Sequence, residues 1–250
     1  MAKHRTRILK LLFGAATAGL LCAAAPAQQP EIVATVLDAS ITRSDLTAIT
    51  DDRPRARKLL AVIWDHVAPH YVASRGLRAT DAEIADLAAY DKRFETKDRS
   101  QRARKLEELD QRLRDEALDA DERAYMQQFR ATLQRLARYD AERDKEPPAD
   151  AEQQATAYAA WIEMWKMNKA IYEEYGGVVA RTRFGPDPHG ARAALLRDYE
   201  AQGLLTIADA ALRTEVRETL AAQPLDVIPP DRVDFTPYWK RPIPPSYFPN

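Results

Sequence analysis

The stretch VATVLDASITRSDL, residues 33–46, changes its pattern halfway along. Its first half is rich in β-branched residues, which predicts two short strand pieces around Leu37 and Asp38. Thr42 is followed three residues later by Asp45, which is a pattern that caps the start of a helix. The stretch therefore predicts a short strand or hairpin that leads directly into a helix.

Most of the sequence after this stretch predicts helix. Only eight glycines occur in 250 residues, and long segments are rich in Ala, Leu, Glu, Arg and Gln. Apolar residues recur at helical spacing between residues 52 and 76, and Gly76 is a natural helix end. Thr80 and Glu83 then form a capping box that begins another helix. We expect a mainly helical protein with small β elements.

Residues 98–144 contain two narrow apolar seams in otherwise charged sequence. The seam residues lie three or four apart: Leu106, Leu109 and Leu113, then Met126, Phe129, Leu133 and Leu136. Residues of the helix-capping type, Asp119 to Asp121, separate the seams. This predicts a long helical hairpin whose arms pack through a coiled-coil-like strip. We interpret its charged faces as solvated surface, with a binding face for an ionic partner as the alternative.

The predicted helix 151–175 follows a break at Glu146-Pro147-Pro148 and is the most aromatic part of the chain. The candidate peptide-binding residues are the aromatic residues on nearly one face of it: Tyr158, Trp161, Trp165 and Tyr172. They would line an apolar groove for client polypeptides, and the alternative is a central core helix. Aromatic side chains dominate burial in both cases, so the sequence leaves both open.

A small two-stranded β element is expected within residues 178–207, with a helix inside it and another helix ending near Gln223. The last segment, residues 224–250, contains eight of the chain's sixteen prolines and five aromatic residues. Proline at this density forbids helix and favours extended backbone. We expect this C-terminal tail to dock on its own domain, with a partner-binding arm as the alternative.

The N-terminus has the pattern of a secretory signal peptide. Basic residues between Lys3 and Lys10 precede an apolar run from Leu11 to Ala25, and an A-x-A site ends at Ala27. The run is shorter than the about 20 residues of a transmembrane helix, so an uncleaved anchor is the weaker alternative. We therefore expect cleavage after Ala27, a periplasmic location and no stable membrane insertion.

Cleavage would divide the chain into a signal peptide (1–27), a helical domain (28–223) that includes the hairpin, and the tail (224–250). The only cysteine, Cys22, lies in the signal peptide, which excludes disulfides, a catalytic cysteine and thiolate metal sites from the exported protein. Positive and negative charges are mixed along the chain, so nucleic acid is not an expected partner. The oligomeric state is left open.

The sequence contains no motif typical of an active site or a nucleotide site. His66 and His70 could share a helix face, but a metal site needs a third ligand and Pro69 lies between them. We interpret both histidines as structural. No pair of carboxylates stands out as an acid/base pair. We predict no catalytic residues, no metal and no cofactor.

Two segments carry a resemblance to a known family. Residues 34–46, ATVLDASITRSDL, resemble the opening of the SurA-type periplasmic chaperones and the related PpiD and PrsA proteins, which read V-A-x-V-N-G-x-x-I-T-x-x-D/E-L. Residues 73–84, ASRGLRATDAEI, resemble their A-x-x-x-G-[IV]-x-[VA]-[ST]-D-x-E-[IV]. The resemblance covers residues 31–87 and implies a helical domain that cradles unfolded polypeptide. Leu37-Asp38 replaces the family's Asn-Gly turn, and no parvulin domain is recognisable.

Three functions follow from these patterns. The leading hypothesis is a non-catalytic, chaperone-like periplasmic protein that binds unfolded or extended polypeptides, including envelope proteins. The first alternative is an adaptor or scaffold of a cell-envelope assembly that uses the hairpin or the tail. The second is a protein related to peptidyl-prolyl isomerases, although residues 98–175 read as charged helix where the family has its isomerase module.

Overall fold

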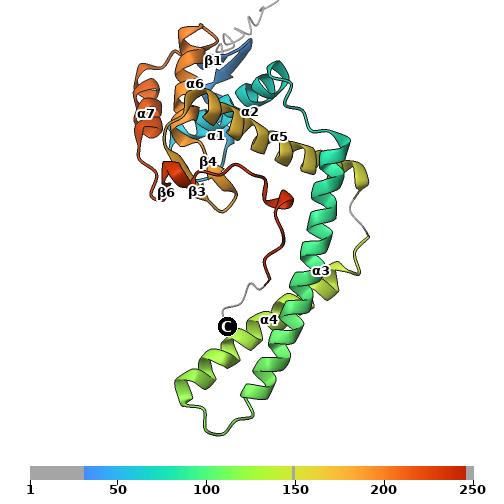
Figure 1. Ribbon diagram of the computed structural model, residues 1–250. Coiled ribbons are helices and arrows are strands. Elements are labelled where there is room, and N and C mark those ends of the chain that lie inside the picture. Colours follow the sequence, from blue (N-terminus) through green and yellow to red (C-terminus); the bar gives the residue numbers. More distant parts are fainter. Residues whose placement is uncertain (1–30, 148–149, 246–250) are drawn as a thin grey trace, which may run out of the picture. The chain divides into compact units, whose positions relative to one another are not determined.

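The computed structural model describes residues 31–147 and 150–245. Its helices are α1 (Arg43–Ala48), α2 (Arg55–Ser74), α3 (Asp81–Arg112), α4 (Ala120–Arg143), α5 (Ala151–Tyr175), α6 (His189–Ala201) and α7 (Ala210–Ala221). Its strands are β1 (Ile32–Val36), β2 (Ala39–Thr42), β3 (Val179–Thr182), β4 (Gly185–Asp187), β5 (Leu205–Ile207) and β6 (Val227–Ile228). The described part is mainly helical with a few small antiparallel strands, as predicted (Figure 1).

The expected absence of a membrane-spanning helix concerns the described residues, whereas the expected signal peptide does not. No helix in residues 31–147 or 150–245 is long and apolar enough to cross a bilayer. The expected signal peptide, residues 1–27, lies outside the described residues, as does its cleavage site.

The N-terminal stretch forms a tight hairpin. β1 and β2 pair antiparallel with Val36 opposite Ala39, so Leu37 and Asp38 alone make the turn. Leu37 adopts a positive φ of 53°, a conformation that costs Leu more than the Asn of an Asn-Gly pair. The Leu37 N–H donates to Leu204 O at 2.6 Å. Pairing with the segment around β5 thus supports a turn whose own residues do not favour it.

The predicted helix ends are confirmed. Thr42 and Asp45 make reciprocal side-chain-to-backbone hydrogen bonds at the start of α1, and Thr80 and Glu83 do the same for α3. Each box satisfies backbone N–H groups that have no partner within the helix. Gly76, just after α2, has a φ of 65°, which glycine adopts without steric cost.

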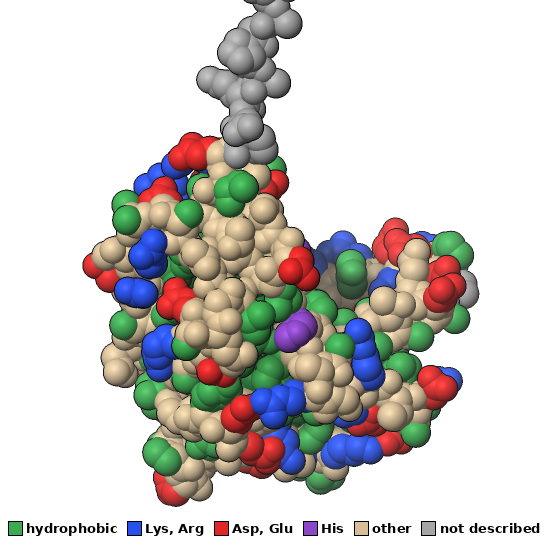
Figure 2. Space-filling view, turned by 90° about the horizontal axis from the view of Figure 1, so that it is seen from above, with side chains coloured by type: hydrophobic (Ala, Val, Ile, Leu, Met, Phe, Trp, Pro, Cys, Tyr) green, Lys and Arg blue, Asp and Glu red, His purple; other side chains and the backbone are tan. Residues whose placement is uncertain are grey.

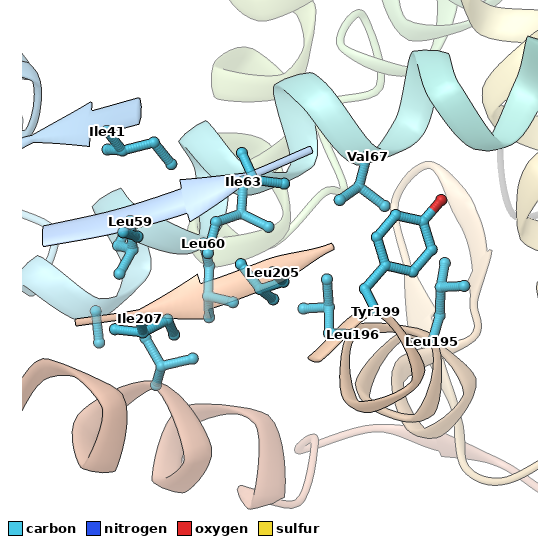
Figure 3. Close-up of a cluster of buried hydrophobic side chains, with 14 of the residues drawn as sticks. Ile41, Leu59, Leu60, Ile63, Val67, Leu195, Leu196, Tyr199, Leu205 and Ile207 are labelled. Carbon is cyan, nitrogen blue, oxygen red and sulfur yellow. The ribbon is translucent and has the colours of Figure 1, made fainter. Parts of the chain in front are cut away.

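The largest core lies around a three-stranded sheet in the order β2-β1-β5, with α2, α6 and α7 packed nearby. β5 joins β1 although the two strands lie far apart in the sequence. Side chains of α2, α6 and β5 meet in this core (Figure 3). Ile63 and Ile207 are almost fully buried, and each side chain of this kind contributes about 1.5–3 kcal/mol through burial.

A second three-stranded sheet lies beside α5. β3 and β4 form a hairpin, and β6 from the tail pairs with the other edge of β3. The strand expected near residues 204–207 is β5, which belongs to the first sheet and not to this one. Gly185, at the turn of the β3–β4 hairpin, has a φ of 108°, and a Cβ there would lie 2.7 Å from the Trp165 ring. The hairpin therefore rests directly on α5.

The helical hairpin forms through α3 and α4, with one correction in its seam. Leu109, Met126 and Leu133 are buried together between the arms, but Leu136 is 43% exposed and lies outside the seam. The sequence spacing includes Leu136 because it lies three residues after Leu133. Leu133, however, faces the other arm, whereas Leu136 faces away from the seam. α3 is one continuous helix, so the arm begins at Asp81 rather than near residue 98.

Ion pairs cover the flanks of this narrow seam. Arg102 pairs with Asp140 at 2.7 Å, and Arg112 pairs with Glu122 at 2.6 Å. Figure 2 shows one face of the molecule, on which positively and negatively charged side chains are interspersed without a broad area of a single charge. An exposed pair such as Arg112 and Glu122 contributes little stability, about 0–1 kcal/mol. The buried leucines and Met126, with the mostly buried pair of Arg102 and Asp140, therefore hold the arms together.

Candidate functional site

The aromatic face of α5 is divided between two environments. Tyr158, Trp161 and Trp165 belong to a cluster with α3 and the tail, whereas Tyr172 packs on Phe235 with ring centroids 5.2 Å apart. Trp165 is 7% exposed, and the other three rings are half-buried. The face is therefore neither an open groove nor a fully enclosed core helix, because much of it is covered by the chain's own tail.

Trp165 is the centre of this arrangement. Its indole Nε1 donates to Phe235 O at 2.6 Å. Its ring meets the rings of Tyr238 and Trp239 edge to face, at centroid distances of 5.9 and 5.4 Å. Edge-to-face contacts add to the energy of burial by about 0.5–1.5 kcal/mol each. One side chain thus joins α5 to two parts of the tail.

The tail lies across a surface that we call the tail-binding surface, formed by Leu87 and Tyr90 of α3 with Ile162 and Trp165 of α5. Trp239 is 6% exposed and packs into this set. Figure 1 shows the tail running from β6 toward α3. The expected docking of the tail on its own domain is thus seen for residues 226–245, while Tyr247 and Phe248 lie outside the described residues.

Three side chains of the helices bind backbone carbonyls of the tail. Trp165 Nε1 donates to Phe235 O at 2.6 Å, Lys97 Nζ to Ile243 O at 3.3 Å, and Gln101 Nε2 to Pro245 O at 2.6 Å. Lys240 of the tail also pairs with Asp86 of α3. A carbonyl is present in every residue, so the three carbonyl contacts do not depend on the side chains of the bound segment.

A hollow adjoins the tail-binding surface, shares Trp165 with it and is also lined by Tyr238 of the docked tail. Its volume is about 430 Å³. We call it the arginine-rimmed hollow. Its lining residues include Trp161, Trp165, Phe184, Tyr238 and the arginines Arg181, Arg183, Arg232 and Arg241. Phe184 is 50% exposed, and its ring meets Trp161 edge to face at 5.7 Å. The sequence identified the tryptophans but not the arginines, which look like ordinary surface charges.

Docking of the tail is expected to weaken at alkaline pH because of Tyr238. Burial is the main reason that the pKa of Tyr238 is raised to about 12 in the docked tail, and the negative charge of Asp91 adds to the effect. In a detached tail the pKa of this tyrosine would be about 10. The neutral phenol is favoured when docked, so its contribution is complete below pH 10 and decreases between pH 10 and 12. Limited proteolysis of the tail across this range measures the effect.

Tyr238→Phe is the control, because it removes the phenol but keeps the ring. The variant should therefore lose part of the pH dependence of tail release. An unchanged profile in Tyr238→Phe would contradict the role given to the phenol.

Two titratable side chains of the helices, His70 on α2 and Asp91 on α3, each form a hydrogen bond with a tyrosine. His70 Nδ1 is 2.8 Å from Tyr199 Oη on α6, and α2 continues through Pro69. No group of three or more His, Cys, Asp or Glu residues that could hold a metal occurs in the described part of the chain. Burial raises the pKa of Asp91, opposed by a hydrogen bond from Tyr158.

Comparison with known proteins adds no relative to this description. No protein-family model, no curated protein and no solved structure matches the chain. The similarity of residues 31–87 to SurA-type chaperones therefore stays a prediction.

Proposed function

We propose that this chain is a periplasmic, chaperone-like protein of the SurA type that binds extended polypeptide segments without catalysis. Its clients would be unfolded polypeptides, including envelope proteins. The sequence supports the proposal through the signal-like N-terminus and the family resemblance of residues 31–87. The surfaces beside α5 support the binding of polypeptide.

The mode in which the tail is held carries the proposal. A proline-rich segment, with a 3-10 turn at Tyr238–Lys240, is anchored by two buried aromatic rings, Phe235 and Trp239, and by side-chain donors to three of its carbonyls. Carbonyl recognition tolerates many sequences, and a buried aromatic anchor supplies most of the energy. A protein that must bind many unfolded segments needs this combination.

In this proposal the tail is an intramolecular ligand of the tail-binding surface, and clients displace it. It is tethered to the surface that it covers, and short tethers give effective concentrations of the order of mM. Only segments that outcompete the tail would then bind, which protects an apolar surface from nonspecific association. Displacement would expose Leu87, Tyr90, Ile162 and Trp165 together.

The test is suppression of aggregation. The full chain is expected to slow the aggregation of several unrelated denatured proteins at equimolar concentration, as measured by light scattering. Because binding is through backbone carbonyls and buried aromatic anchors, the effect should not be limited to one client. If the chain slows the aggregation of none of the clients, the proposal is wrong.

A second candidate function, an adaptor of an envelope assembly, is favoured by one observation. Tyr125, Leu136 and Tyr139 project from one side of α4 and are 67%, 43% and 63% exposed. Their separations of 11 and 3 residues place them on one helix face. A single partner in a pull-down, lost in a Tyr125→Ala/Tyr139→Ala variant, together with no suppression of aggregation, would favour the adaptor.

A further inference from the structure

The arginine-rimmed hollow has a charge that the rest of the protein does not share. Four arginines line it, and Asp234 is the only acidic residue among its lining residues in the described part of the chain. The whole sequence is close to neutral, with 37 basic and 38 acidic residues. Positive charge is therefore concentrated here, and a concave site with such a field attracts anionic groups.

Two of the four arginines have their charge partly neutralised, and two do not. Arg241 pairs with Asp234 at 2.7 Å, and Arg181 pairs with Asp226 at 3.4 Å. Arg183 lies over the Phe184 ring, 4.5 Å from its centroid. Within residues 31–147 and 150–245, neither Arg183 nor Arg232 forms an ion pair. Both are exposed and can therefore bind the carboxylates of a partner.

The hollow has a mixed lining that includes three aromatic rings. Trp161, Trp165 and Phe184 line it together with polar side chains, and about 430 Å³ is enough for one large side chain of a partner. It also adjoins the tail-binding surface, because Trp165 belongs to both and Tyr238 of the docked tail lines the hollow. A segment bound in the hollow would thus lie beside the docked tail.

We propose that the hollow binds an acidic, extended polypeptide segment, with one large apolar side chain against the Trp161 and Phe184 rings and carboxylates on Arg183 and Arg232. The inference rests on the proposed polypeptide-binding function and gives it a selectivity. The partner is a polypeptide because the hollow adjoins a surface that already holds a polypeptide segment, the proline-rich tail. It is acidic because two cations at the rim have no anion of their own.

The experiment measures binding of three labelled peptides to the full-length protein by fluorescence anisotropy. The first peptide has one phenylalanine flanked by glutamates, the second has lysines in place of the glutamates, and the third is acidic with serine in place of phenylalanine. The first should bind about tenfold more tightly than either of the others, and salt should weaken it.

Two variants locate the site. Arg183→Gln/Arg232→Gln should reduce affinity for the first peptide about tenfold, whereas Arg104→Gln/Arg138→Gln, the same charge change on exposed hairpin positions, should not. Equal losses in both variants would overturn the proposal, because net charge would then explain the binding.

The remaining outcomes separate this inference from the proposed function. Equal affinity for the acidic and basic peptides, with suppression of aggregation intact, overturns the selectivity but leaves polypeptide binding standing. Absence of binding by all three peptides together with no suppression of aggregation overturns both.

Discussion

Trp239→Ala is expected to release the tail from the tail-binding surface and to increase the capture of unfolded polypeptide. The Trp239 side chain is 6% exposed, and truncating a buried Trp to Ala costs about 3–5 kcal/mol. This shifts the balance between docked and released tail by about a hundredfold to a few thousandfold. The largest core contains no tail residue, so the domain should remain folded.

Hydrogen exchange of residues 233–245 measures the release, and light scattering with denatured clients measures the gain in capture. Tyr125→Ala is the matched control, because it also removes an aromatic ring, but one that is 67% exposed and distant from the tail contacts. A tail that stays protected in Trp239→Ala, or clients that bind no better, would contradict the role of Trp239 as anchor.

Trp165→Ala is expected to lower the free energy of unfolding by about 3–5 kcal/mol. The ring packs against Tyr238, Trp239 and Gly185, so its removal leaves a void at the junction of α5, the β3–β4 hairpin and the tail. Phe235 O also loses its hydrogen-bond donor. For a chain of this size the melting temperature should fall by about 6–20 °C, as measured by circular dichroism.

Phe184→Ala and Trp165→Phe serve as controls. Phe184 is 50% exposed, so its truncation should cost less than about 1 kcal/mol. Trp165→Phe keeps most of the apolar ring but removes the donor to Phe235 O, which should cost about 1–3 kcal/mol. A loss in Trp165→Ala no larger than in Phe184→Ala would mean that the ring does not connect these elements.

The fold was predictable where local chemistry decides it. The capping boxes at Thr42 and Thr80 and the stop at Gly76 depend on residues a few positions apart, and they are as predicted. The pairing of β5 with β1 depends on residues far apart in the sequence, so no local pattern indicates it. Leu136 was misplaced because spacing alone does not say which side of α4 meets α3.

The candidate site was less predictable, for the same reason. The sequence identifies the aromatic face of α5, but what covers Trp165 comes from Phe235, 70 residues later. Arg183 and Arg232 reach the same hollow from a β hairpin and from the tail. Neither arginine differs in its local sequence from an ordinary surface residue, so only their positions in space indicate a binding site.

The most direct test of polypeptide binding beside α5 uses the tail itself as the ligand. A synthetic peptide with the sequence VDFTPYWKRPIPP, residues 233–245, is titrated into full-length Trp239→Ala protein by isothermal calorimetry. We predict saturable binding, at least about tenfold tighter than that of the same peptide with alanine at the Trp239 position, and much weaker binding to the wild-type chain, whose own tail competes. Equal binding of the two peptides, or no binding of either, would contradict the proposed site.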